Sequence, residues 1–415
     1  MGAPAARVAE LSRLWTEAGH NVTVLTGFPN HPTGCVPAEY RSKLRRLIAR
    51  EQLHGVNVVR SWLLPRPNRE PLERIVNYAS FSGSAAVTGT FLPRPDLVIA
   101  TSPQLLVGLS GWWIARCKQV PFIFEVRDLW PESLAAVGAS RENSIFYRTL
   151  SRIASFLYRR SDHVVVVSPA FRERLVEDWG LDEANISVVE NGVDTDLFSP
   201  SAERPELRTA LGAEGKFIVS YIGTIGMAHG MDTVMEAAEQ LQRTSPQIIF
   251  VVVGEGSEKE RTISNVRVRG LTNIRFLDQQ AREDIPAFIS ASDLCLVPLR
   301  KSPVFNTVIP SKLLEFMACA RPVVVGVGGL TRKIVEQANA GLAVEPENAT
   351  ELARAIRQMA ANPDLGKEFG DNGRRYILQN FTRAQKARTY LDVMESLLES
   401  RRGYRAMPAS ITASR

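Results

Sequence analysis

Pro310-Ser311-Lys312-Leu313-Leu314-Glu315-Phe316-Met317-Ala318 is the stretch that most clearly indicates the fold class of this chain. It lies between two apolar segments, residues 294–299 and 322–325, of the kind that form buried parallel strands. A proline followed by a serine is a helix-start signal, and we expect Ser311 to cap the helix. The sequence therefore predicts a strand–helix–strand unit of an α/β domain.

The predicted helix presents two charged side chains near its start. At about 100° per residue, Ser311, Lys312, Glu315 and Cys319 fall on one face. Open α/β sheets bind ligands at the carboxyl ends of their strands, where this helix begins. Its positive end suits a phosphate, and the carboxylate suits a pair of sugar hydroxyls. The alternative is an ordinary surface Lys–Glu pair three residues apart.

The composition is that of a soluble globular protein with two to three domains. The 415 residues are 45% hydrophobic and 23% charged. A formal charge of +6 allows contact with an anionic substrate or membrane, and we expect no nucleic-acid partner. Four scattered cysteines and five histidines without metal-ligand spacing indicate a reduced, cytoplasmic protein with no metal site.

Strands and helices alternate along the whole chain, which predicts parallel sheets. A polar stretch at residues 199–205 marks the expected domain boundary. We therefore expect domains at 1–200 and 201–385, a helix at 386–402 that packs back on the first domain, and a flexible tail at 403–415.

One uncharged run, residues 97–115, is long enough to be tested as a membrane span. Its proline, glycine and serine residues favour another interpretation. We expect a buried strand over 97–100, a turn, and an apolar helix over 105–117.

Three glycine turns follow predicted strands. They are Asn191-Gly192-Val193-Asp194, the loop Gly223 to Gly230, and Gly254-Glu255-Gly256. Glycines there permit a tight turn and a close approach of backbone to phosphate. Each turn alone is weak evidence, because a plain strand–helix turn has the same composition.

In this order, and with the 310–318 helix, the turns resemble the nucleotide-sugar-dependent glycosyltransferases of family 4. That resemblance covers residues 2 to 400 and implies the α/β GT-B fold, two doubly wound Rossmann-like domains that face a cleft. The segments 27–34 and 125–133 are similar to an O-antigen and capsule subgroup, the L-fucosaminyltransferase-like enzymes.

The resemblance implies a retaining transferase that needs no metal or cofactor. Its donor is a UDP-sugar, with an N-acetylated or deoxy amino sugar. The acceptor is a lipid-linked or other glycan, such as a polyprenyl-diphosphate-linked sugar, in surface polysaccharide synthesis at the inner face of the cell membrane. The implied donor-binding residues are Gly223, Gly226, His229, Gly254, Gly256, Phe276, Ser311, Lys312 and Glu315.

Domain 1–200 would then supply the acceptor side. Asp128, next to Arg127 after a predicted strand, is the candidate for orienting or deprotonating the acceptor hydroxyl. In the alternative interpretation Asp128 caps the following turn and Arg127 pairs with Glu132. His31, in a proline-rich loop, is a weaker candidate.

The chain departs from the family pattern in three places. Thr307 stands where the family has a first glutamate, eight residues before Glu315, and His229 stands where it has a lysine. Lys312 could supply the missing cation. The chain also starts inside the family's first loop, so we expect the first strand of the sheet to be absent. We accordingly expect a natural product that begins upstream, and a less stable and poorly active 415-residue form.

Residues 41–50 hold five basic residues and no acidic one, interleaved with leucine and isoleucine. Such a segment suits a membrane surface, which fits a peripheral location. A solvated loop is the alternative.

Two further functions stay open at this point. A UDP-sugar 2-epimerase shares the two-domain architecture, but the 191–194 turn and the 310–318 helix speak against it. A truncated member that binds a nucleotide sugar without turnover is the second alternative, because of Thr307 and the missing strand. Assays for transfer and for UDP-sugar hydrolysis would separate the three.

Overall fold

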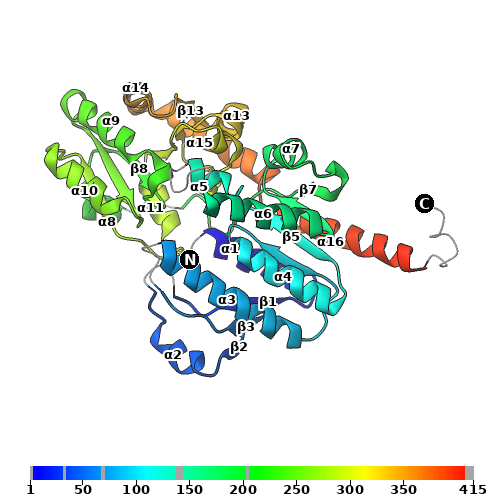
Figure 1. The fold of residues 1–415 in the computed structure, drawn as a ribbon. Helices are drawn as coiled ribbons and strands as arrows, with labels where there is room; N and C mark the ends of the chain where they lie inside the picture. The colour runs from blue at the N-terminus through cyan, green and yellow to red at the C-terminus, as the bar shows by residue number, and fades with distance from the viewer. Residues whose placement is uncertain (1–2, 31–33, 67–70, 137–143, 202–204, 407–415) are drawn as a thin grey trace. The chain divides into compact units, whose positions relative to one another are not determined.

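The computed structural model describes residues 3–30, 34–66, 71–136, 144–201 and 205–406 (Figure 1). Its contacts divide the chain into two compact units. The carboxy-terminal unit holds residues 191–386 together with residues 1–6, and the amino-terminal unit holds residues 7–190 and 387–415.

The division falls after Glu190, earlier than the polar stretch at 199–205. Backbone hydrogen bonds explain this: the Val193 amide donates to the carbonyl of Phe381 at 2.9 Å, and the Arg383 amide donates to the carbonyl of Val193 at 2.8 Å. The helix α16 (Arg383–Ala406) continues past residue 403, where we expected a tail to begin, and residues 407–415 lie outside the described residues.

The carboxy-terminal unit contains one six-stranded sheet in the order β10-β9-β8-β11-β12-β13. All its pairs are parallel, which confirms the predicted α/β class. The strands are β8 (Phe217–Ile222), β9 (Ile248–Val253), β10 (Ile274–Leu277), β11 (Leu294–Pro298), β12 (Val323–Gly326) and β13 (Gly341–Ala343). Residues of β9, β11 and β12 are buried along their whole length, because helices cover both faces of the sheet.

The helices of this unit precede, connect and follow the strands of the sheet. They are α8 (Pro205–Ala210), η2 (Met227–His229), α9 (Met231–Thr244), α10 (Lys259–Val268), α11 (Ile285–Ala291), η3 (Val304–Thr307), α12 (Ser311–Ala318), α13 (Gly329–Ala338), α14 (Ala349–Ala361) and α15 (Pro363–Asn380). The predicted cap of α12 is wrong. Pro310 occupies the N-cap position, no side chain caps the helix, and Ser311 is its first residue.

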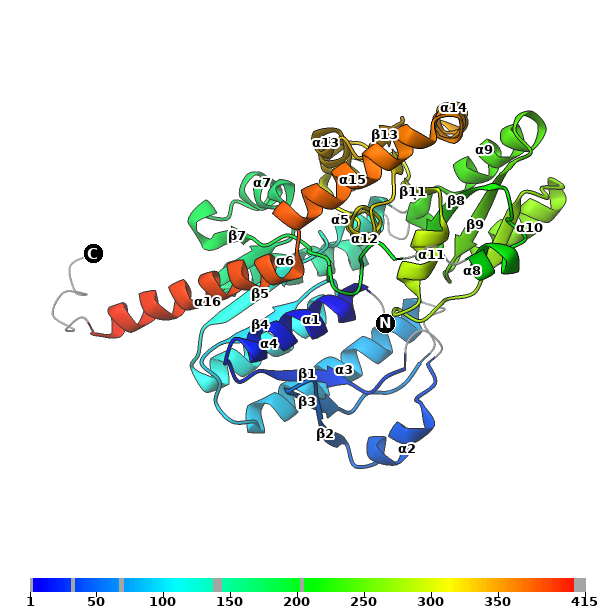
Figure 2. The same ribbon diagram turned by 180° about the vertical axis from the view of Figure 1, so that it is seen from behind.

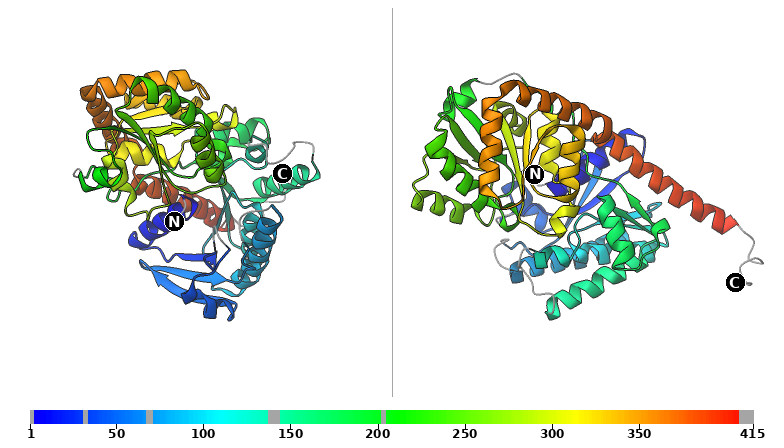
Figure 3. Two further views of the ribbon diagram at one scale, coloured as in Figure 1. Left: turned by 90° about the vertical axis from the view of Figure 1, so that its left-hand side faces the viewer. Right: turned by 90° about the horizontal axis from the view of Figure 1, so that it is seen from above.

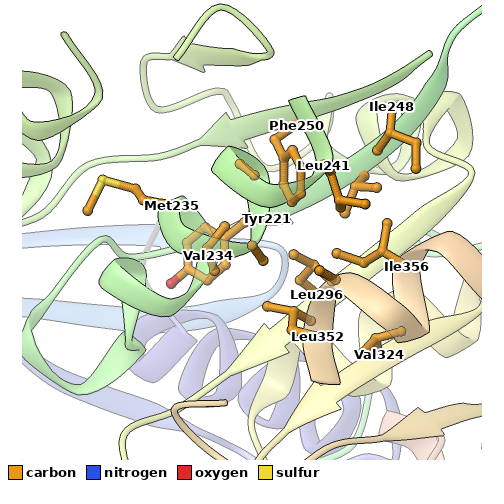
Figure 4. Close-up of a cluster of buried hydrophobic side chains, with 14 of the residues drawn as sticks. Tyr221, Val234, Met235, Leu241, Ile248, Phe250, Leu296, Val324, Leu352 and Ile356 are labelled. Atoms are coloured by element: carbon orange, nitrogen blue, oxygen red, sulfur yellow. The ribbon is translucent and has the colours of Figure 1, made fainter. Parts of the chain in front are cut away.

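The core of this unit lies between the sheet and the helices α9 and α14 (Figure 4). Side chains from β8, β9, β11 and β12 meet apolar faces of both helices. The labelled members are Tyr221, Val234, Met235, Leu241, Ile248, Phe250, Leu296, Val324, Leu352 and Ile356.

The strands of the amino-terminal unit form two separate sheets. One has the order β1-β3-β2, with β1 (Thr23–Gly27), β2 (Ile48–Leu53) and β3 (Val56–Ser61). The other is parallel, in the order β4-β5-β6-β7, with β4 (Val98–Thr101), β5 (Phe122–Val126), β6 (His163–Val166) and β7 (Ile186–Val188). Within the described residues β1 and β4 are sheet edges that do not pair with each other.

The strand β2 runs antiparallel to β3, so the expectation of parallel strands throughout is wrong here. The cause is local. His54 and Gly55 form the tight turn between the strands, with φ values of 50° and 80°. Two successive residues with positive φ are the signature of a hairpin turn.

Helices cover both faces of the β4–β7 sheet. The helices of the unit are α1 (Ala3–Glu17), α2 (Ala38–Leu44), α3 (Pro71–Phe91), α4 (Leu105–Lys118), α5 (Glu132–Ala136), α6 (Ile145–Arg160), α7 (Pro169–Glu177), η1 (Glu183–Asn185) and α16. Ile123 packs with α1 and α16, whereas its neighbour Phe124 faces Gly108 of α4. Since alternate strand residues point to opposite faces, α1 with α16 and α4 with α6 cover different sides (Figures 2 and 3).

None of the helices among the described residues is long and apolar enough to cross a bilayer. The run 97–115 forms β4 and α4, as expected.

Candidate functional site

The glycine loops after β8 and β9 pack backbone against backbone. The Ile225 amide donates to the carbonyl of Glu255 at 2.9 Å. Gly254 has a φ of +146°, and a Cβ there would lie 2.0 Å from the carbonyl oxygen of Gly223. A Cβ on Gly256 would lie 2.1 Å from the carbonyl oxygen of Ile225. The contact between the two loops therefore requires glycine at 254 and 256.

Lys312 points into this pair of loops. Its Nζ is buried, has no hydrogen-bond partner among the described residues, and lies 3.9 Å from the ring centroid of Tyr221. A Cβ on Gly223 would come within 2.9 Å of Nζ. Burial lowers the pKa of Lys312 to about 7, although the nearby Glu315 favours the charged form. The amine of Lys312 is therefore buried beside the glycine loops without a hydrogen-bond partner in the part of the chain that the structure describes.

His229 lies beside the same loop. Its Nδ1 accepts a hydrogen bond from the Gly226 amide at 3.3 Å, so the proton of the neutral ring resides on Nε2. Burial, and secondly the charge of Lys312, lower the pKa of His229 to about 3. The ring is therefore neutral near pH 7 and acts as a hydrogen-bond donor, not as a cation.

Glu315 has an ionic partner that the sequence did not predict. Its Oε1 lies 3.3 Å from Nη1 of Arg282, and the Arg282 guanidinium lies 5.0 Å from the ring centroid of Phe198. The expected polar face of α12 is corrected accordingly. Lys312 turns inward to the glycine loops, Glu315 pairs with Arg282, and Cys319 is buried. No local pattern links positions 282 and 315, so sequence reasoning missed Arg282.

The remaining predicted donor residues differ in their surroundings. Gly223, Gly226, His229 and Lys312 form one cluster. Phe276 lies in the edge strand β10 and packs, partly buried, against the core. Thr307 donates its hydroxyl to the carbonyl of Val304 at 2.6 Å, which closes η3.

Asp128 lies between β5 and α5 in the amino-terminal unit. Its Oδ2 accepts from Nε1 of Trp130 at 3.2 Å, and its Oδ1 accepts from the hydroxyl of Ser133. Burial raises the pKa of Asp128 against the effect of these bonds. The alternative interpretation, in which Asp128 organises the next turn, therefore describes its contacts. A raised pKa also suits a general base.

A buried ion pair lies close to this turn, between Arg7 of α1 and Glu125 of β5. Nη2 of Arg7 is 2.9 Å from Oε1 of Glu125, and its Nη1 donates to the carbonyl of Glu190 at 2.9 Å. Burial acts to raise the pKa of Glu125, but Arg7 and then Arg127 lower it below its usual value. Sequence reasoning missed Arg7. The sequence did contain a sign of such a pair, because Glu125 lies inside the otherwise apolar strand β5.

The alternative partner of Arg127, Glu132, has different neighbours. Burial raises the pKa of Glu132, and the side chains that lower it are Trp179 and Arg174. His31, with residues 32 and 33, lies outside the described residues.

The basic segment 41–50 covers the end of α2, a turn and the start of β2. Leu47 is 58% exposed, and Arg45 and Arg46 are exposed beside it. The basic side chains and this leucine are thus open to solvent.

Comparison with known proteins places both units in one class of enzymes. Residues 2–192 match the model of the glycosyl transferase 4-like domain, and residues 203–376 match that of the glycosyl transferases group 1. The chain is 26% identical to a protein of Escherichia coli named as a colanic acid biosynthesis glycosyl transferase, WcaI. That match covers 84% of this chain and 86% of the relative.

Solved structures agree on the fold. A sucrose-phosphate synthase from Thermosynechococcus elongatus superimposes with a TM-score of 0.77 at 22% identity, over 96% of this chain and 94% of that one. The Anabaena protein HepE, solved with UDP-glucose, gives 0.68 at 19% identity, over 91% of this chain and all of that one. The chain is therefore a glycosyltransferase of the GT-B fold, with a glycosyl transferase 4-like domain followed by a group 1 domain.

Proposed function

We propose that this glycosyltransferase moves a sugar from a UDP-sugar, with retention of configuration, to a lipid-linked or other glycan acceptor in surface polysaccharide synthesis. The observation that carries the proposal is Lys312, whose buried Nζ has no hydrogen-bond partner among the described residues and lies against Gly223. A buried ammonium without a partner is costly, and an anionic ligand would offset that cost.

Two groups in the carboxy-terminal unit would stabilise the departing diphosphate. Lys312 supplies the charge, and Nε2 of His229 donates a hydrogen bond. Both are held in place before the ligand arrives, Lys312 by the Tyr221 ring and His229 by the Gly226 amide. Preorganised donors and charges lower the barrier because they do not reorient as negative charge develops.

Glu315 would hold the ribose hydroxyls, as implied by its position on α12 after Lys312. Its ion pair with Arg282 keeps a positive charge beside the carboxylate. Asp128 would act on the acceptor hydroxyl, with Arg127 as its neighbour. Ser133 and Trp130 hold its carboxylate in position, and the raised pKa makes the carboxylate a stronger base.

The donor, the biological role and the subgroup are proposed from similarity to other proteins, and the location is proposed from an exposed basic segment. The donor nucleotide is supported by HepE, whose structure contains UDP-glucose. A role in polysaccharide synthesis is supported by the name of WcaI. The amino-sugar donor and the L-fucosaminyltransferase-like subgroup rest on segments 27–34 and 125–133. The exposed basic segment 41–50 supports a peripheral place on the inner face of the membrane.

Titration calorimetry with UDP tests the donor site. We expect UDP to bind the parent protein, and the substitution Lys312→Met to weaken binding by about 100-fold, since a charge-assisted contact of about 1.5–3 kcal/mol is lost. Glu315→Gln should weaken binding of UDP by about 10- to 100-fold through loss of the contact to the ribose. Equal affinity in the Lys312→Met variant would remove this residue from the site.

Product analysis separates the remaining functions. Transfer to an acceptor, with the anomeric configuration read by NMR, supports the proposal. Conversion of the UDP-sugar without any acceptor would identify an epimerase. Binding of UDP with neither reaction would identify a non-catalytic binder. The charge reversal Arg45→Glu with Arg46→Glu should leave UDP affinity unchanged, which makes it a control for the folded state.

A further inference from the structure

A cavity of about 210 Å³ lies at the amino ends of strands β5 and β6 in the amino-terminal unit. One water molecule needs only roughly 10–15 Å³, so the cavity has room for a larger group. Its walls come from the last turns of α4 and α6, from the start of β5 at Phe122, and from α16. Asp128 follows the other end of β5, about 13 Å away at about 3.3 Å per residue. The cavity is therefore separate from the proposed acceptor site.

Three arginines and one carboxylate line this cavity in the part of the chain that the structure describes. Arg116 belongs to α4, Arg160 to α6 and Arg401 to α16, and Asp162 precedes β6. The three positive charges and one negative charge give a net charge of +2. Oδ1 of Asp162 pairs with the Arg401 guanidinium, and its Oδ2 accepts from the Phe122 amide at 2.8 Å. The carboxylate is thus already engaged through both oxygens.

The other two arginines differ from the basic residues beside them. Basic side chains in a last helical turn commonly bond backbone carbonyls. Lys118 of α4 donates to a carbonyl in the last turn of α3 at 2.9 Å, and Arg159 of α6 donates to a carbonyl beyond the end of α7 at 3.3 Å. Arg116 and Arg160 make no hydrogen bond or ion pair with any described residue, and both are exposed. Capping of a helix end therefore does not account for them.

An indole forms another part of the wall. Trp112 and Arg116 lie four residues apart on one face of α4. The Trp112 ring packs edge-on against Phe156 with the centroids 4.9 Å apart, and the Arg160 guanidinium lies 6.0 Å from the same Phe156 ring. The indole N–H of Trp112 makes no hydrogen bond with any described residue. The cavity thus offers two guanidiniums and an indole N–H, which are all donors.

We propose that this cavity binds a phosphate group through Arg116 and Arg160. Planar guanidinium forks bind phosphate oxygens in pairs, and the charge of a phosphomonoester, about −2 at neutral pH, matches the net charge of the lining. The volume leaves room for the part of the molecule that carries the phosphate. A soluble phosphomonoester and a lipid headgroup both present this group. The site goes beyond the proposed function, because it lies outside the donor and acceptor sites.

Titration calorimetry with inorganic phosphate tests the cavity, with saturating UDP present to occupy the donor site. We expect the parent protein to bind phosphate, and Arg116→Gln with Arg160→Gln to bind it at least tenfold more weakly, because both forks are lost. The charge-matched control is Arg152→Gln with Arg159→Gln, two exposed residues of α6 outside the lining. It should bind phosphate as the parent does.

The substitution Asp162→Asn tests the site with the opposite sign. Asparagine keeps an oxygen for the Phe122 amide, removes the negative charge and releases Arg401 toward the ligand. Phosphate should therefore bind severalfold more tightly, which a general loss of structure would not produce. UDP affinity should be unchanged in all these variants. Failure of UDP to bind would contradict the proposed donor site, and the phosphate titrations of the two double variants would still report on this cavity.

Two probes identify the carrier of the phosphate. Glycerol 3-phosphate is the soluble phosphomonoester, and vesicles with phosphatidic acid present the same group on a lipid. Binding of glycerol 3-phosphate without vesicle binding assigns the site to a soluble ligand. Vesicle binding that Arg116→Gln with Arg160→Gln removes assigns it to a lipid headgroup.

Three outcomes would overturn the inference. The first is a parent protein that does not bind phosphate. The second is equal phosphate affinity in the parent and the Arg116→Gln/Arg160→Gln protein. The third is an equal loss in the Arg152→Gln/Arg159→Gln control, which would show attraction to the basic surface in general.

Discussion

The two units of this glycosyltransferase differ in the continuity of their sheets. In the carboxy-terminal unit six strands form one sheet, and the central strand β8 pairs with β9 on one side and β11 on the other. In the amino-terminal unit the strands form two sheets, and β1 and β4 each end one of them. A doubly wound pattern in the sequence therefore specifies the order of elements without specifying that every strand edge is paired.

The units also treat buried charge in opposite ways. Arg7 in the amino-terminal unit has Glu125 and two backbone carbonyls as partners, whereas Nζ of Lys312 in the carboxy-terminal unit lies over the ring of Tyr221 and has no hydrogen-bond partner among the described residues. A satisfied pair holds elements together, whereas a buried amine without a hydrogen-bond partner is costly, and in the proposed function the anionic donor offsets that cost. Removing the charge of Arg7 should therefore lower the free energy of unfolding. Removing the charge of Lys312 should raise it and weaken binding of the donor.

The largest effect is expected from Arg7→Met. Removing one partner of a buried pair leaves the carboxylate of Glu125 uncompensated, so unfolding free energy should fall by about 3–5 kcal/mol. Urea denaturation followed by circular dichroism measures it. Arg13→Met is the matched control, because Arg13 pairs with Glu17 at 2.7 Å on the exposed side of the same helix. There the loss should stay below about 1 kcal/mol. Equal losses in both variants would contradict the assigned role of Arg7.

Lys312→Met should change stability in the other direction. Methionine keeps the apolar stem and removes the buried ammonium, so the unfolding free energy without ligand should rise by about 1–3 kcal/mol. The sign follows from the pKa. A lysine whose pKa falls to about 7 in the folded protein binds its proton more weakly than in the unfolded chain, which destabilises the fold below its ordinary pKa. The exposed Lys301→Met is the control and should be neutral. A loss of stability in Lys312→Met would show that the ammonium has partners.

Much of the fold was accessible from the sequence, because helical and strand periods alternate clearly through the second half. The region between residues 27 and 95 was not. Its helix α3 lacks the polar face that identifies amphipathic helices, and the β2–β3 hairpin depends on His54-Gly55, a turn that is easily overlooked.

The candidate site was predictable in composition but not in contacts. Lys312, His229 and the glycines could be named from their motifs. The pairs Arg282–Glu315 and Arg7–Glu125 join residues 33 and 118 positions apart, and no spacing rule relates such positions. The inward direction of Lys312 was also hidden, since helical periodicity placed it on the polar face of α12.

The pH dependence of UDP binding sharpens the contrast between a paired and an unpaired charge. Lys312 loses its proton near pH 7 in the free protein, and a bound diphosphate would raise its pKa. Binding then takes up a proton above that pH. Affinity should fall as pH rises from 7 to 9, by up to about tenfold per unit. His229 cannot produce this change, because its pKa is about 3. Lys312→Met should abolish the dependence, and a parent affinity that stays constant over this range would contradict the assignment.

The smallest effect concerns the open edge of β4. The amides of Val98 and Ser102 donate to the carbonyls of Pro121 and Glu125 at 2.9 and 2.8 Å, so the alternate amides of Ile99 and Thr101 point away from β5. Hydrogen exchange resolved by NMR should show these two amides opening more easily than that of Val98, by about 1–2 kcal/mol. In β8 both alternating sets of amides have partner strands, so neighbouring residues there should exchange at similar rates. Equal protection of all β4 amides would mean that the outer edge of β4 is covered in solution. The proposed contrast between the two sheets would then be wrong.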